Sequence, residues 1–250
     1  MRLLEPLVPD PSAPLARPHP LAKIVAALVL MLALFVTVDL VTSGLVVATL
    51  LVAARYSGLP PRALAARATP LLIGAASLGV FNAVLSQNPV AGAAIALRII
   101  GISLAGMLAV ATIDPTDLAD ALVEHAHAPS RFVVGALAAF RLFPLFSREW
   151  DILGLARRAR GIEADRTIVD RARAFPGRAL GLLVAAIRRA TRLALAMDAR
   201  GFGGRHCRTL ARPRPLTLRD GAVVAGAIAL ALGATSLSVA LGTWRPLIAF

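Results

Sequence analysis

The chain has 250 residues, of which 58% are apolar and only 16% are charged. This composition excludes a disordered protein, which would be rich in charge, and disfavours a soluble single-core domain, which needs more polar surface. The 27 basic and 14 acidic residues give a formal net charge of +13, which is typical of a polytopic membrane protein with one basic side.

The first two apolar segments predict a transmembrane hairpin. Leu21–Thr37 and Val38–Ala54 are each about 17 residues long, the lower limit for crossing the hydrocarbon of a bilayer. Asp39 lies between them. A carboxylate costs less free energy at a connection than at the centre of one long helix, so we predict two spans and not one. Lys23 lies at the start of the first segment, where a lysine side chain can reach the membrane interface. The proline-rich residues 1–20 have no apolar run and do not resemble a secretory signal.

Three further apolar segments bring the prediction to about five transmembrane helices, within residues 21–113 and 220–241. Pro70–Leu85 and Val90–Ile113 are the predicted third and fourth spans, and Gly221–Leu241 is the fifth. A polar loop, Arg55–Thr69, should join the second span to the third, since it carries three arginines and two adjacent prolines.

The distribution of basic residues predicts the orientation. Lys and Arg precede the first span and separate the second span from the third, whereas the turns at Asp39 and Ser86–Pro89 have neither. The positive-inside rule then puts the N-terminus in the cytoplasm and residues 242–250 outside, as in a protein of a bacterial or archaeal inner membrane. Residues 148–219 also face inward, and they hold 17 basic and six acidic residues, a net charge of +11.

Residues 114–219 predict a basic cytoplasmic domain of helices. Asp114 as N-cap and Pro115 at the first position indicate a helix that ends near Glu124, before a break at residues 127–129. We predict a membrane-surface helix, interrupted near Pro144, and three further helical segments, the last two of them separated by Pro176. These four segments are Phe132–Phe146, Arg148–Arg160, Asp165–Phe175 and Gly177–Arg200.

The last of these segments is amphipathic. It carries an apolar stripe at helical spacing, made of Leu183, Ile187, Ala190, Ala194 and Met197. The small residues Gly181 and Ala185, four positions apart, favour a close crossing of two helices, although an alanine-rich composition explains them equally well.

Signatures of catalysis are missing from the sequence. The only lysine, Lys23, follows an alanine, so the chain has no Walker A motif. His125 and His127 are two positions apart and would point to different faces of a helix. Cys207 has no second cysteine for a disulfide or a thiolate metal site, and its neighbour His206 does not make it a catalytic dyad. We therefore predict no catalytic residue, no metal site and no cofactor.

Arg98 is a basic residue well inside the fourth predicted span. A charge within the membrane is a functional candidate by default. A structural role is the favoured alternative, because the side chain could reach the outer interface or pair with Gln87 or Asn88. The spans otherwise lack the polar pathway of a carrier, which indicates a scaffold.

Two helical segments of the basic domain end in the same tripeptide, Ala159-Arg160-Gly161 and Ala199-Arg200-Gly201. An arginine in the last turn of a helix interacts favourably with the helix dipole, and the glycine after it allows a sharp turn. The alanine leaves room for a partner, so each guanidinium is suited to an acidic groove. One such end is ordinary in an arginine-rich chain, whereas a matching pair indicates a shared role.

With these tripeptides and the helix start at Asp114–Asp117, the sequence resembles the transmembrane coupling (T) component of energy-coupling factor transporters, a branch of the ABC importers for vitamins and transition-metal ions. The resemblance implies a non-enzymatic subunit in which Arg160 and Arg200 each dock into one of two cytoplasmic ATPase subunits. It also implies that the membrane and coupling helices hold a separate substrate-binding membrane protein, to which they pass the ATP-driven motion.

Two other classes of protein stay open at this point. An integral membrane enzyme acting on lipid-like substrates could use the acidic cluster Asp114, Asp117, Asp120 and Glu124, although helix capping and a solvated face explain the cluster more simply. A membrane-tethered nucleic-acid-binding protein would account for the basic domain. However, the sequence has no recognition motif, and anionic lipid accounts for the charge equally well, so we expect no nucleic-acid partner.

Overall fold

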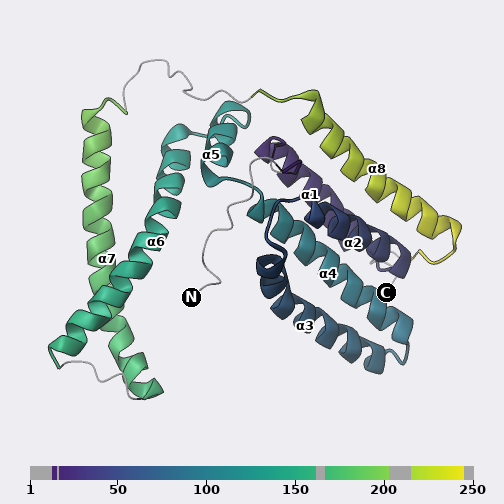
Figure 1. The fold of residues 1–250 in the computed structure, drawn as a ribbon, viewed down its shortest axis with the longest axis horizontal. Coiled ribbons are helices and arrows are strands. Elements are labelled where there is room, and N and C mark those ends of the chain that lie inside the picture. Colours follow the sequence, from purple (N-terminus) through teal and green to yellow (C-terminus); the bar gives the residue numbers. More distant parts are fainter. Residues whose placement is uncertain (1–12, 16, 162–166, 203–214, 245–250) are drawn as a thin grey trace. The chain divides into compact units, whose positions relative to one another are not determined.

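The computed structural model describes residues 13–15, 17–161, 167–202 and 215–244 (Figure 1). These residues form eight α-helices, which confirms the predicted all-α fold. They divide into two compact units, one made of the chain up to Leu122 and from Pro213 onward, the other of Val123–Arg212. The predictions for most of residues 1–20, for Asp165, for His206 and Cys207 and for most of residues 242–250 fall outside the described residues.

Five apolar helices make up most of the first unit. α4 packs against α1, α2 and α3, and α8 packs against α1 and α2 (Figure 1). The shared core is aliphatic and includes Leu34, Val46, Leu50, Leu104 and Leu108. The helices of this unit are α1 (Pro20–Val36), α2 (Leu40–Arg55), α3 (Pro61–Leu85), α4 (Pro89–Ala111) and α8 (Leu218–Ala240).

The helix break predicted at Asp39 is confirmed. α1 and α2 are separate helices, and Asp39 lies between them with only 2% of its surface exposed. Its Oδ2 atom accepts a hydrogen bond of 2.7 Å from the backbone N–H of Thr42. The carboxylate therefore caps the first turn of α2, where the partial positive charge of the helix terminus stabilises it.

The polar loop predicted over Arg55–Thr69 is wrong, because α3 begins at Pro61 and takes in most of it. Pro60 and Pro61 start this helix instead of breaking it. A proline at the first helical position loses nothing, since its N–H would have no partner within the helix there. Pro70 lies inside α3 without ending it.

Two basic side chains within the first unit find backbone partners. Lys23 is 9% exposed, and its Nζ atom donates a hydrogen bond of 2.9 Å to the carbonyl oxygen of Thr112, at the C-terminus of α4. Arg98 donates from Nη2 to the carbonyl oxygen of Phe35, at 2.5 Å, and lies 5.4 Å from the centre of the Phe35 ring. The predicted pairing of Arg98 with Gln87 or Asn88 is therefore wrong, since its partner is the last turn of α1.

Length and composition mark four of the described helices as able to cross a membrane, namely α3, α4, α8 and α6 (Ser130–Ala159). The first two predicted spans are also apolar helices, but they are shorter, with 17 residues in α1 and 16 in α2. α6 belongs mainly to the second unit. Its first half corresponds to Phe132–Phe146, the segment that we predicted as a helix on the membrane surface.

α5 (Pro115–Glu124) forms as the sequence predicts. Asp114 Oδ1 accepts a hydrogen bond of 2.7 Å from the Thr116 N–H, and the Asp114 carbonyl accepts one of 2.9 Å from the Leu118 N–H. The helix ends at Glu124, and His127 adopts a φ of 51°, so the chain turns where the break was predicted. Asp114 thus acts as the cap of α5.

The second unit consists mainly of two long helices, α6 and α7 (Ile168–Ala199), which pack against each other (Figure 1). The breaks predicted at Pro144 and Pro176 are wrong, because both helices continue through their prolines. A proline removes one hydrogen bond and can bend a helix without ending it, if the neighbouring turns are held. Contacts between the two helices hold these turns, including the Trp150 and Phe175 rings at 5.4 Å.

Candidate functional site

The two Ala-Arg-Gly tripeptides form helix ends of the same geometry. α6 ends at Ala159 and α7 at Ala199, and the glycine two positions later has a φ of +70° at Gly161 and +76° at Gly201. The N–H of each glycine donates a hydrogen bond of 2.9 Å to the carbonyl oxygen three residues earlier. The prediction that glycines end both helices is confirmed.

The two glycines are required by backbone conformation and not by space. A Cβ atom built at Gly161 or Gly201 meets no atom within 4 Å, but the positive φ disfavours any residue with a side chain. All residues of the two tripeptides are exposed: Ala159, Arg160, Gly161, Ala199, Arg200 and Gly201. Each arginine therefore projects from a narrow helix end that a partner can approach.

The two helix ends lie far apart. α6 ends near the start of α7, and α7 ends at the opposite end of the helix pair (Figure 1). α7 has 32 residues and is therefore about 48 Å long at the rise of an α-helix. The two predicted docking arginines therefore lie at two separate places on the helix pair.

Small residues allow the close crossing of α6 and α7. A Cβ atom built at Gly181 lies 3.7 Å from Leu153, and one built at Gly154 lies 3.0 Å from Arg178. One built at Gly177 lies 2.5 Å from the guanidinium of Arg157. Gly181 was predicted from the sequence to lie at such a crossing, whereas Gly154 and Gly177 were not. The only sequence signal for these two was a glycine within an otherwise helical pattern.

A charged contact accompanies the crossing. Arg189 Nη1 lies 3.0 Å from Glu149 Oε2, and the same guanidinium lies 5.9 Å from the centre of the Phe146 ring. The side chains of Arg189 and Glu149 are 34% and 28% exposed, so solvent weakens the ion pair. The pair joins α7 to α6 through one side chain from each helix.

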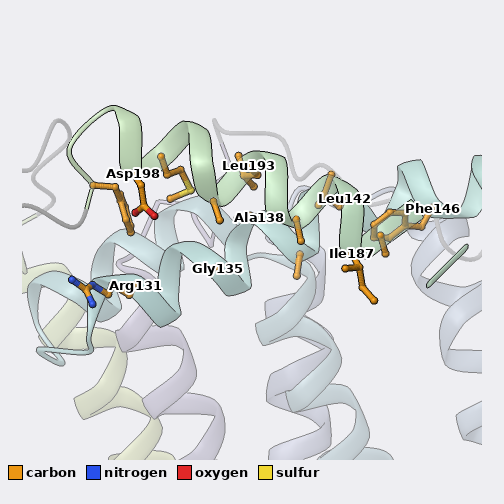
Figure 2. A pocket seen from close by; sticks show the side chains of 14 residues that line it. Arg131, Gly135, Ala138, Leu142, Phe146, Ile187, Leu193 and Asp198 are labelled. Carbon is orange, nitrogen blue, oxygen red and sulfur yellow. The ribbon is translucent and has the colours of Figure 1, made fainter. Parts of the chain in front are cut away.

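An apolar groove of about 630 Å³ lies between the N-terminal half of α6 and the C-terminal half of α7. Figure 2 shows Arg131 and Asp198 at one end of this groove and Phe146 and Ile187 at the other. Four members of the predicted stripe on α7 line it, whereas Leu183 does not. The wall on α6 was not predicted from the sequence, and it includes the small residues Gly135, Ala138 and Ala139.

The chemistry of the second unit is suited to binding. Its helices expose large apolar side chains, among them Phe132 at 77% and Phe140 at 69%. Exposed apolar surface of this kind is typical of contact with lipid or another protein. Across the parts of the chain that the structure describes, no group of three or more His, Cys, Asp or Glu side chains could hold a metal ion.

Comparison with known proteins gives a consistent result. A family model described as a cobalt transport protein (CbiQ) matches residues 11–210. The chain is similar to proteins named "energy-coupling factor transporter transmembrane protein EcfT" from three bacteria. It is 37% identical to that of Brevibacillus brevis over 108 residues (43% of this chain and 38% of the relative) and 33% identical to that of Staphylococcus aureus over 138 residues (52% and 51%).

The similarity to the protein of Heliobacterium modesticaldum is more extensive, with 28% identity over 237 residues, 85% of this chain and 88% of the relative. The chain thus spans about half or less of the first two relatives and most of the third.

Proposed function

Since this chain belongs to the family of transmembrane (T) components of energy-coupling factor transporters, we propose that it is the non-enzymatic coupling subunit of an ATP-driven importer. It passes the motion of cytoplasmic ATPase subunits to a separate membrane subunit that binds a vitamin or a transition-metal ion. It lies in the cell membrane of a bacterium or archaeon, with its N-terminus in the cytoplasm.

The observation that carries this proposal is the pair of matching helix ends. Arg160 and Arg200 are exposed at the ends of two long helices that cross each other. A guanidinium forms strong two-pronged hydrogen bonds with a carboxylate, so each arginine would enter an acidic groove of one ATPase subunit. Because the sites lie at opposite ends of the pair, two ATPase subunits can bind at the same time.

The groove between α6 and α7 offers a surface for the substrate-binding subunit. Its volume of about 630 Å³ and its mainly apolar lining suit side chains from a helix of another membrane protein. A partner held there would contact the same two helices that carry the docking arginines. Movement of either helix end by an ATPase subunit would then reach the partner through α6 and α7.

The second candidate function, a membrane enzyme acting on lipid-like substrates, has less support. Family membership does not favour it. The acidic residues from Asp114 to Glu124 would have to carry its chemistry, and Asp114 already caps α5 through the Thr116 N–H. Helix capping explains this carboxylate without a catalytic role.

Reversal of both arginine charges tests the proposal. Arg160→Glu combined with Arg200→Glu places a carboxylate in each acidic groove, which should cost roughly 3–5 kcal/mol per site. We expect the variant to insert into the membrane normally, to purify without ATPase subunits and to lose ATP-driven uptake.

The matched control is Arg148→Glu combined with Arg188→Glu. It makes the same change of charge on the same two helices, at exposed positions away from their ends. This control should retain the ATPase subunits and uptake. If the Arg160/Arg200 variant also retains both, the docking role of these arginines is wrong.

A further inference from the structure

An apolar cleft opens in the first unit, where α1 and α8 begin and α2 and α4 end. Its volume is about 420 Å³. All four helices contribute aliphatic side chains to its walls, among them Leu30, Leu50, Leu108 and Leu230, and Gly226 of α8 leaves part of the wall open. A space of this size and shape is suited to an alkyl chain.

A second cavity, of about 650 Å³, continues from the first. The two share Pro14, Pro18 and Val223 as lining residues, so they are parts of one depression. The second cavity carries the exposed charges of the lining, the arginines Arg17 and Arg219. The depression is therefore apolar on one side and basic on the other.

The charges that line this depression are mainly positive. Arg17 and Arg219 contribute two exposed cations. Lys23 also lines the cleft, but it is buried and donates its hydrogen bond to the Thr112 carbonyl. Asp220 is the one carboxylate among the described residues that line the two cavities. Both oxygens of Asp220 are already engaged, Oδ1 with the His19 N–H at 2.5 Å and Oδ2 with the N–H and hydroxyl of Thr217, each at 2.7 Å. A ligand would meet net positive charge next to an apolar cleft.

We propose that this depression binds one anionic phospholipid, with an acyl chain in the cleft between α1, α2, α4 and α8 and the phosphate between Arg17 and Arg219. The positive-inside rule predicts that this end of the unit faces the cytoplasm. Anionic headgroups in that leaflet attract basic residues near the membrane surface. The proposal is independent of the proposed transport function, because it involves none of the residues of α6 or α7.

Native mass spectrometry of the purified full chain in detergent tests the headgroup part. The probes are phosphatidylglycerol and phosphatidylcholine with identical acyl chains. We expect one phosphatidylglycerol to be retained more strongly than phosphatidylcholine. Arg17→Gln combined with Arg219→Gln should weaken the retention of phosphatidylglycerol by roughly 25-fold, about fivefold for each lost arginine, and leave phosphatidylcholine unchanged.

A matched pair of variants of α8 tests the cleft. A Cβ atom built at Gly226 or at Gly233 meets no atom within 4 Å, so a side chain can begin at both positions without a clash at Cβ, but only Gly226 lines the cleft. Gly226→Leu fills the space for the alkyl chain and should lower the retention of both lipids by at least about fivefold, whereas Gly233→Leu should not.

Three results would overturn the proposal. One is equal retention of the two lipids by the unmodified chain. Another is retention of phosphatidylglycerol by the Gly226→Leu variant at the level of the Gly233→Leu control. The third is displacement of phosphatidylglycerol by millimolar inorganic phosphate, which would indicate a phosphate site without a lipid chain.

Discussion

Gly161 and Gly201 give the clearest link between one residue type and one local structure. Each adopts a positive φ just after a helix, in open space, so an added side chain costs free energy only through backbone strain. We predict that Gly161→Ala and Gly201→Ala each destabilise the last turn of the preceding helix by about 1 kcal/mol. Hydrogen exchange of peptides that end at residues 161 and 201 should become about fivefold faster.

Gly233→Ala is the control for this prediction. Gly233 lies inside α8, and an added Cβ atom there also meets nothing within 4 Å. Alanine is the better helix former at such a position, so exchange in α8 should stay the same or become slower. Unchanged exchange at the ends of both α6 and α7 would mean that the glycines do not hold these ends in the observed conformation.

The positions of some single residues could be predicted from the sequence, whereas the partners of others could not. The difference lies in how far along the chain the partner is. Asp39 was predicted at a connection between helices and Asp114 as a helix cap, and local rules were sufficient for both. In the structure each caps a helix that begins one residue later. Lys23 binds a carbonyl 89 positions away, and Arg98 binds one 63 positions away. No local pattern indicates such partners, because they depend on which helices pack together.

At the scale of elements, the helix boundaries were predictable where capping residues set them and not where proline was the guide. The start of α5 follows from Asp114, and the C-terminal ends of α6 and α7 follow from Gly161 and Gly201. Pro144 and Pro176 were expected to end helices, yet α6 and α7 continue through them because each helix is held by the other. Tertiary packing thus offsets the loss of one hydrogen bond per proline.

The contact between α3 and α4 depends on two glycines that the sequence analysis did not single out. A Cβ atom built at Gly92 meets the carbonyl oxygen of Gly79 and lies 2.5 Å from the Cβ atom of Ala83. The obstacle includes backbone, which cannot rotate away as a flexible side chain can. This close approach is how small residues let helices pack within a membrane.

Gly92→Ala should therefore force α3 and α4 apart and lower the free energy of unfolding by about 1–3 kcal/mol. Thermal unfolding in detergent would show this as a loss of several degrees in Tm. The control is Gly74→Ala in α3, where an added Cβ atom meets nothing within 4 Å and Tm should not fall. Equal Tm values for the two variants would mean that α3 and α4 do not approach as closely as described.

At the scale of the whole molecule, the composition and the apolar segments predicted the fold class, and the matching tripeptides predicted where two helices end. The groove between α6 and α7 could not be predicted in the same way. It requires the stripe of α7 to face the small residues Gly135, Ala138 and Ala139 of α6. That pairing depends on the crossing at Gly154, Gly177 and Gly181, which is a property of the folded pair and not of either helix alone.

The distance between the two helix ends leads to a prediction about stoichiometry. Groups more than about 10 Å apart with no shared partner usually contribute additively to binding, and α7 alone is about 48 Å long. If each arginine holds its own ATPase subunit, Arg160→Glu alone should release one subunit and leave the other bound. Arg200→Glu alone should release the second subunit and leave the first. Native mass spectrometry without added ATP would then give one ATPase subunit per chain in each single variant.

The double variant should retain none, because the two losses add. Arg148→Glu, which changes the charge of α6 away from its end, should keep both subunits and serves as the control. Release of both subunits by either single change would show that the two ends act as one site, and independent docking would then be wrong. If the two ATPase subunits differ in mass, the comparison of the two single variants also identifies the helix end to which each subunit binds.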